Sequence, residues 1–88
     1  MMSKPLREDG PPLTERVNDY DEVHFVTYLR LLDADADGAD WREAVEIIFG
    51  IDADADPVRA KRIHDTHLAR ARWMSKVGYR HLLEPRMQ

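Results

Sequence analysis

Residues 40–57, DWREAVEIIFGIDADADP, decide the fold because they hold one complete helix, a turn and the start of a second helix. A D-x-x-E capping box opens at Asp40, and such a box begins a helix. Gly50 stands where a glycine ends a helix in the left-handed conformation. An aspartate directly before Pro57 pairs a preferred N-cap with a preferred first helical residue. The stretch therefore predicts a short helix, a six-residue turn over 51–56 and a new helix from Pro57.

A long basic helix is predicted after this turn. Its apolar positions recur every three or four residues, which is the spacing of one helix face: Ala60, Ile63, His67, Ala71, Met74 and Val77. We expect a helix over 57–77, which Gly78 ends. The helix, turn and helix have the form of a helix-turn-helix whose turn exceeds the usual length of about three or four residues.

Another helix is predicted upstream, over residues 19–32. Its apolar residues form two overlapping stripes, and together these make a wide buried face: Phe25, Leu29 and Leu32 in one stripe, Val23 and Val26 in the other. Residues 33–39 alternate acids with alanines around a glycine and predict a polar turn. The predicted fold is therefore all-α, a small helical domain over residues 19–84 with a long third helix.

The two ends of the chain carry weaker helix signals. Residues 1–18 hold several prolines and a glycine with few large apolar residues, which is typical of a flexible arm. We expect Tyr79, Leu82 and Leu83 to fold back as a short terminal segment. Residues 85–88 follow as a C-terminal tail.

Length and composition indicate one small globular domain. A chain of 88 residues is too short for two domains, and 43% hydrophobic with 34% charged residues is ordinary for a globular protein. The absence of cysteine rules out a disulfide and a thiolate nucleophile. No apolar run approaches the ~20 residues that cross a bilayer, and the N-terminus lacks the apolar core of a signal peptide. We therefore expect a bacterial cytoplasmic protein with no membrane partner.

Charge is divided unevenly along the chain. Residues 1–56 carry fifteen acids and five bases, whereas residues 57–88 carry eight bases and two acids. The basic helix could neutralise DNA phosphates, or its bases could pair with the protein's own carboxylates on a solvated face. The DNA contacts would come from four bases: Arg59, Lys61, Arg62 and Arg70. The acids of the turn over 51–56 would lie close to the phosphates and would oppose binding.

Two local patterns contain the residue types of a metal site. The D-x-D-x-D-G run over 33–38 resembles the start of a calcium loop, but Ala44 stands where the loop needs a bidentate glutamate. His64 and His67 lie three apart on the predicted helix, and no further zinc ligands converge on them. We therefore expect no metal and no cofactor. Because no nucleophile, base and oxyanion donor occur together, we expect no enzymatic activity.

Four stretches of the chain, taken together, resemble a known family. They are YDExHFVTYLRLLD at 20–33, GADWREA at 38–44, HLARARWM at 67–74 and GYRHLL at 78–83. Jointly they are similar to the family catalogued as domain of unknown function 2285, over about residues 12–84. The resemblance implies an extended-turn helix-turn-helix variant found on mobile elements of proteobacteria.

The family takes two forms, and the chain resembles the second. Some members are the C-terminal half of transcriptional activators of conjugative transfer and bind DNA through a basic face. Others stand alone, are acidic, and act as antiactivators of the QseM type, which bind the activator's N-terminal domain in place of its own C-terminal domain. The net charge of −4 and the three aspartates of the extended turn resemble the acidic form.

The resemblance implies an antiactivator that limits horizontal transfer of an integrative and conjugative element, in a setting of quorum sensing and transcription regulation. We expect a monomer that binds a protein partner through an acidic surface, with nucleic acid binding as the alternative. Trp41 and Trp73 fit either core packing or partner binding. The expected partner anchors are aromatic residues and one arginine: Tyr28, Trp41, Arg42, Trp73 and Tyr79.

Overall fold

The computed structural model describes residues 10–78, and every regular element in this range is helical. The predicted all-α class is therefore confirmed. The elements follow in chain order as α1 (Asp19–Val23), α2 (Phe25–Ala36), α3 (Trp41–Phe49), α4 (Pro57–Trp73) and the π-helical turn η1 (Met74–Gly78). None of these helices combines the length and the apolar character that crossing a membrane requires.

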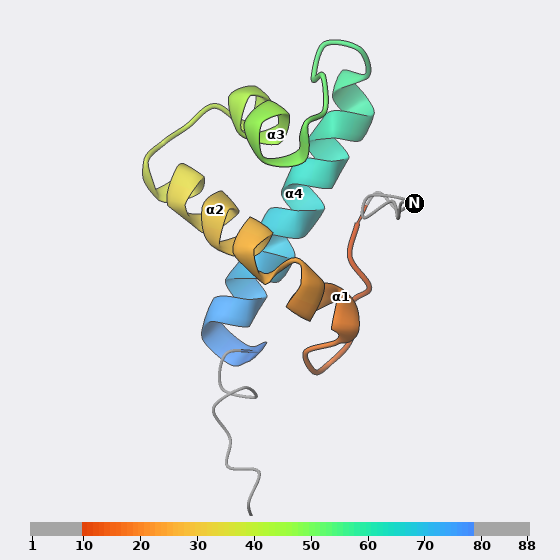
Figure 1. Cartoon of the computed structure of the whole chain (residues 1–88), viewed down its shortest axis with the longest axis vertical. Coiled ribbons are helices and arrows are strands. Elements are labelled where there is room, and N and C mark those ends of the chain that lie inside the picture. Colours follow the sequence, from red (N-terminus) through yellow and green to blue (C-terminus); the bar gives the residue numbers. More distant parts are fainter. Residues whose placement is uncertain (1–9, 79–88) are drawn as a thin grey trace, which may run out of the picture.

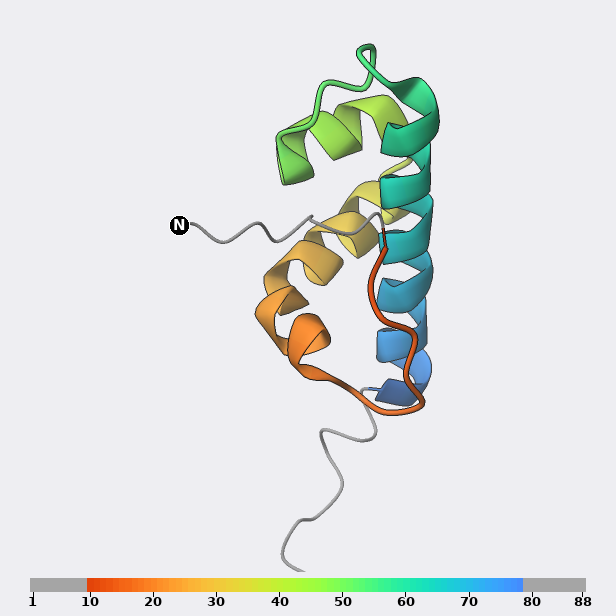
Figure 2. The ribbon, with the colours of Figure 1, turned by 90° about the vertical axis from the view of Figure 1, so that its right-hand side faces the viewer.

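The longest helix, α4, forms the spine of the domain (Figure 1). α3 packs on the N-terminal part of α4, where Val45, Ala53 and Ile63 belong to one buried cluster. α2 packs on the C-terminal part, where Tyr28 and Ala71 belong to a second buried cluster. Two small cores therefore follow one another along a single helix, and Figure 2 shows α2 and α3 on the same side of it.

The predicted helix, turn and helix are confirmed by the way their ends are capped. The Asp40 carboxylate accepts a hydrogen bond from the N–H two residues later, at 3.1 Å, and begins α3 as an N-cap, but the return bond from Glu43 that would complete the predicted capping box is not formed. Gly50 ends α3 at φ 70°, a conformation that glycine adopts without strain. The Asp56 carboxylate accepts from the N–H three residues later, at 3.2 Å, and Pro57 follows as the first residue of α4. The α-helix gives way to η1 at Met74, inside the predicted range.

The predicted first helix begins at Asp19 as expected, but it is interrupted at His24 and extends to Ala36 instead of ending at Leu32. The backbone of His24 leaves the helical region at φ −102° and ψ 19°, and its buried ring stacks on Tyr20. Residues 33–36 continue α2 because alanine and aspartate do not interrupt a helix that has already begun. The chain turns only at Gly38, where φ is 75°.

The predicted burial of this helix is wrong for most of its face, although Leu32 packs against the second buried cluster as expected. The side chains facing the core of the domain are Tyr28 and Leu31, whereas Phe25, Val26 and Leu29 of the predicted buried face are exposed. Within the described residues, helix α2 contacts α4, α3 and, at its start, α1, and the contact surface that these helices offer does not bury stripes that extend over most of α2. The excess apolar side chains remain on the outer surface.

The sequence predicts a flexible arm over residues 1–18, and this prediction is wrong for residues 10–18, which run along α4 (Figure 2). Pro11 is buried, and the backbone carbonyls of Thr14 and Arg16 accept hydrogen bonds from α4. The Asn18 side chain accepts from the third residue on, at 2.8 Å, and caps α1. The start of the predicted arm, over 1–9, lies outside the described residues.

The predictions for the C-terminal end lie outside the described residues as well. They concern the terminal segment and the tail: Tyr79, Leu82, Leu83 and residues 85–88.

Candidate functional site

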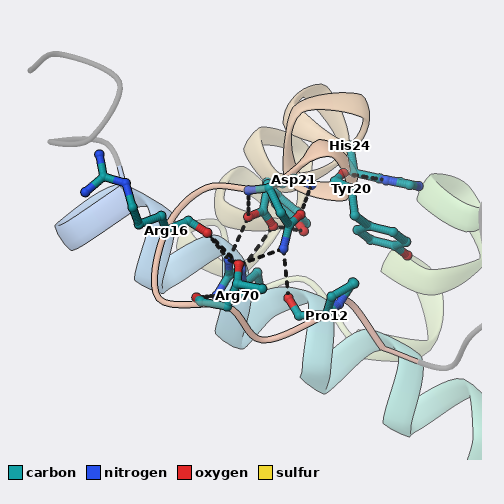
Figure 3. Close-up of polar contacts among 9 residues, drawn as sticks. Pro12, Arg16, Tyr20, Asp21, His24 and Arg70 are labelled. Carbon is teal, nitrogen blue, oxygen red and sulfur yellow. Dashed lines mark hydrogen bonds and ion pairs between the residues drawn. The ribbon is translucent and has the colours of Figure 1, made fainter. Parts of the chain in front are cut away.

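A buried ion pair joins α1 to α4. The Arg70 Nε donates to Asp21 Oδ1 at 3.0 Å, and Arg70 Nη2 donates to Asp21 Oδ2 at 2.7 Å (Figure 3). The Asp21 side chain is 0% exposed and the Arg70 side chain 3%. A two-pronged pair of this kind fixes the orientation of both groups as well as their distance. Arg70, a predicted DNA contact, is therefore unavailable to DNA.

Both members of this pair make further hydrogen bonds, and the Asn18 backbone N–H donates to Asp21 Oδ2 at 3.0 Å. Arg70 Nη1 donates to the carbonyl of Thr14 at 2.8 Å, and Nη2 donates to the carbonyl of Arg16 at 3.2 Å. The Tyr28 hydroxyl donates to Asp21 Oδ1 at 2.8 Å. Two buried charges are thereby surrounded by partners from the N-terminal segment, α1, α2 and α4, as a buried ion pair requires.

The pKa values of this cluster reflect the same contacts. Burial by itself would raise the pKa of Asp21, but hydrogen bonds from Arg70, the Asn18 backbone and Tyr28 outweigh it and hold the pKa below its usual value. Burial, together with the neighbouring Asp21 carboxylate, raises the pKa of the Tyr28 hydroxyl. At neutral pH the carboxylate is therefore ionised and the phenol neutral, so the phenol is the donor in the bond between them.

A second buried polar group, His67, lies on α4 and contacts Tyr20 of α1. Its Nδ1 is 2.7 Å from the carbonyl oxygen of Ile63, which can only accept, so Nδ1 carries the proton. The Tyr20 hydroxyl then donates to His67 Nε2, at 2.7 Å. Burial lowers the pKa of His67, a bond to the Ile63 carbonyl raises it, and the neighbouring His24 lowers it, with a net lowering. The neutral ring is the form that fits this site.

The lowered pKa of His67 predicts a loss of stability in mild acid. The folded chain binds this proton more weakly than the unfolded chain does, so the contribution is complete above pH 6.5 and falls as pH decreases through 6.5. Urea unfolding between pH 8 and pH 5 should show a falling free energy of unfolding, with a shallower fall in His67→Gln. The matched control His64→Gln, on the same helix, should keep the steep fall. Equal pH dependence in His67→Gln and the unaltered chain would contradict the assignment.

The other bases of α4 are also engaged. Lys61 Nζ lies 2.9 Å from Asp65 Oδ2, and Arg72 Nη2 lies 2.7 Å from an oxygen of Asp35 on α2. Burial by itself would raise the pKa of Asp65, but the hydrogen bonds from His64 and Lys61 together outweigh it and hold the pKa below its usual value. Arg59 and Arg62 have interaction partners too. Lys61, Arg70 and Arg72 are therefore paired with carboxylates of the same chain.

The predicted anchors do not form one cluster. Trp41 is half-buried at the start of α3, where Arg42 and Lys61 lie over its ring at 5.1 Å and 5.5 Å from the centroid. Trp73 is half-buried at the end of α4, with the guanidinium of Arg70 3.9 Å from its ring centroid. Tyr28 is only 1% exposed, so its choice as an anchor is corrected. Tyr79 lies outside the described residues.

An apolar patch, which the sequence interpretation placed in the core, is exposed on α1 and α2. We call it the outer apolar face, and it consists of Val23, Phe25, Val26 and Leu29. These side chains are between 40% and 75% exposed, and they come from the end of α1 and the first half of α2. Contiguous exposed apolar side chains on a small domain are typical of a protein-binding surface. The width of the two stripes was the sequence signal for it.

An apolar groove adjoins this face, between α2 and the end of α4. It has a volume of about 250 Å³. Its lining residues come from α2, α4 and η1: Phe25, Tyr28, Leu29, Leu32, Ala71, Met74 and Ser75. Phe25 and Leu29 thus belong both to the outer apolar face and to one wall of the groove.

The acidic run over 33–38 does not form the loop that calcium needs. Asp33 and Asp35 lie within α2, and Asp35 is bonded to Arg72. No three side chains of the metal-binding types converge within residues 10–78.

Comparison with known protein families finds no family that matches the chain, and comparison with curated proteins finds no match either. The resemblance to domain of unknown function 2285 stays a prediction from the residues.

Proposed function

We propose that this protein is an antiactivator, which docks on the partner domain of a transcriptional activator and blocks activation of conjugative transfer of a mobile element. The supporting observation is the exposed outer apolar face, because four large apolar side chains on a short stretch of surface favour a protein partner. The resemblance in the sequence supplies the kind of partner, the activator's N-terminal domain. The protein would act in the bacterial cytoplasm, in place of the activator's own helix-turn-helix domain.

The charge arrangement supports a protein partner over DNA. A helix that binds DNA must direct its cations at phosphates, but Lys61, Arg70 and Arg72 are each paired with a carboxylate of the same chain. The turn before α4 adds three exposed aspartates close to the start of that helix, where base contacts would be made: Asp52, Asp54 and Asp56. Both features oppose binding to a polyanion.

The proposal predicts that Val26→Asp abolishes strong binding to the activator's N-terminal domain. A charge in the middle of the outer apolar face should weaken the complex by about 30-fold or more, the effect of losing an interface hot spot. The ¹⁵N-labelled chain would be titrated with that domain, and chemical-shift changes should centre on Val26 and Leu29. Val58→Asp is the matched control, since Val58 is also an exposed valine (70% against 60%) but lies on α4.

Absence of shift changes at micromolar partner concentration would contradict the proposal, as would equal weakening by the two substitutions. The DNA-binding alternative is tested by a gel shift on operator fragments at low salt. Retardation that disappears steeply as salt rises would favour that alternative.

A further inference from the structure

A cleft lies between α2 and α3, and it shares no residue with the outer apolar face. It has a volume of about 450 Å³. Its apolar lining comes from the end of α2, the connecting turn and α3: Ala34, Ala39, Ala44, Ile47 and Ile48. The small alanine side chains allow a further helix to approach closely, and Ile47 is 74% exposed. This lining suits the apolar face of a helix that docks in a groove.

The charged side chains of the cleft are mainly acidic. Asp33 of α2 and Glu43 of α3 belong to its lining, and Arg30 is the base among the lining residues. Within residues 10–78, neither of the two acidic side chains forms an ion pair or a hydrogen bond. Residues 33–43 together hold five acids and one base. The cleft therefore presents carboxylates without a counter-charge next to exposed apolar side chains.

The position of Asp33 works against the stability of α2. The residue lies in the last turn of the helix, where the aligned peptide dipoles already leave a partial negative charge. The same turn contains no base that would compensate for it. A charge that costs helix stability without an ion pair in the described chain is a local conflict of the kind found at functional surfaces.

We propose that this cleft binds a basic amphipathic helix of a partner protein. Apolar side chains of that helix lie against Ala34 and Ile47. Its lysines or arginines face Asp33 and Glu43, which stand on opposite walls. Charge complementarity selects this occupant, because an acidic helix would bring further carboxylates to a site that already lacks counter-charges. The cleft is a second docking surface and goes beyond the proposed function, since it needs no contact with the outer apolar face.

A designed peptide tests the cleft in the full chain. The probe is a fluorescein-labelled helix of about 18 residues, or five turns, with leucines at a spacing of three and four and lysines on the opposite face. The control peptide carries glutamates in place of the lysines. Fluorescence anisotropy should show at least about tenfold tighter binding of the lysine peptide. In the ¹⁵N-labelled chain, its chemical-shift changes should centre on Ala34, Ala44 and Ile47.

Three results of this titration would overturn the proposal. They are absence of binding at micromolar concentration, equal affinity for the two peptides, and shift changes centred on Val26 and Leu29. The Val26→Asp titration uses another partner and another surface, so either proposal can fail without the other.

Paired substitutions separate binding in the cleft from general attraction between opposite charges. Asp33→Asn with Glu43→Gln should weaken the lysine peptide about tenfold, the effect of losing two exposed ion pairs. Asp52→Asn with Asp54→Asn removes the same charge from the other acidic turn, and an asparagine at 52 can still accept the turn's hydrogen bond. This control should weaken binding less than about twofold at 0.15 M salt, where distant charges are screened. Equal weakening by the two pairs would contradict the proposal.

Two exposed apolar residues provide the matching comparison for the apolar contact. Ile47 is 74% exposed and Val58 70%, so asparagine at either position should leave the fold intact, as circular dichroism would show. Only Ile47→Asn should weaken the lysine peptide, by about fivefold or more. Unchanged affinity in Ile47→Asn would contradict the proposal. A dimer of the peptide-free chain that dissociates in Ile47→Asn, measured by sedimentation, would assign the cleft to a second copy and would overturn it too.

Discussion

Replacing Arg70 with methionine should lower the free energy of unfolding by about 3–5 kcal/mol, because it leaves the Asp21 carboxylate buried without its partner. The hydrogen bonds from Tyr28 and the Asn18 backbone remain, but neither carries a compensating charge. A domain of this size has a total stability of only about 3–5 kcal/mol. We therefore expect Arg70→Met to be largely unfolded at 25 °C, which circular dichroism and urea titration would measure.

Arg72→Met is the matched control for this experiment. Arg72 lies on the same helix and pairs with a carboxylate at the same distance of 2.7 Å, but its side chain is 54% exposed and that of its partner Asp35 is 45% exposed. An exposed pair of this kind contributes about 0–1 kcal/mol. A similar loss in both variants would show that burial of the Asp21 pair does not determine its contribution.

The second large effect is expected at Ile63, in the core cluster shared by α3, the turn and α4. Ile63→Ala should cost about 2–5 kcal/mol, since the side chain is 0% exposed and its removal leaves a cavity. Val58→Ala, on an exposed position of the same helix, should cost far less. Urea unfolding of the two variants gives the comparison.

Tryptophan fluorescence can show whether the stability lost in Ile63→Ala affects both core clusters or only one. Trp41 packs against the cluster of Ile63 and Trp73 against the cluster of Tyr28. With Trp73→Phe or Trp41→Phe as background, each chain has one reporter, at one end of the domain. Because a single helix carries both clusters, Ile63→Ala should shift the urea unfolding transition followed by Trp41 and the one followed by Trp73 equally. A shift confined to the Trp41 signal would mean that the two clusters unfold separately.

The elements predicted correctly are those whose signals lie close together in the sequence. Asp40, Gly50 and the aspartate before Pro57 act within one helical turn, so they could be interpreted without the rest of the molecule. The break at His24 has no such local signal. It accompanies packing of the His24 and Tyr20 rings around His67, which lies more than forty residues away.

The candidate site could be predicted only in part for the same reason. The stripes of Val26 and Leu29 were visible, but periodicity cannot say which of two wide faces a helix turns toward the core. The face of α2 that is turned toward the core is the one that carries Tyr28, which contacts the ion pair of Asp21 and Arg70. The two members of this pair are 49 positions apart in the sequence. Tyr28 belongs to the inner face because its hydroxyl meets this pair, so an aromatic residue that looked like an anchor is a core residue.

The segment over 10–18 is attached to α4 mainly through its main chain. Arg70 binds the carbonyl oxygens of Thr14 and Arg16, and every amino acid carries such an oxygen. Exchanging the exposed side chain of Arg16 leaves its attachment atom in place, whereas inserting or deleting one residue between Thr14 and Asn18 moves the carbonyls out of register. For the attachment of this segment to α4, the number of residues matters more than their identity.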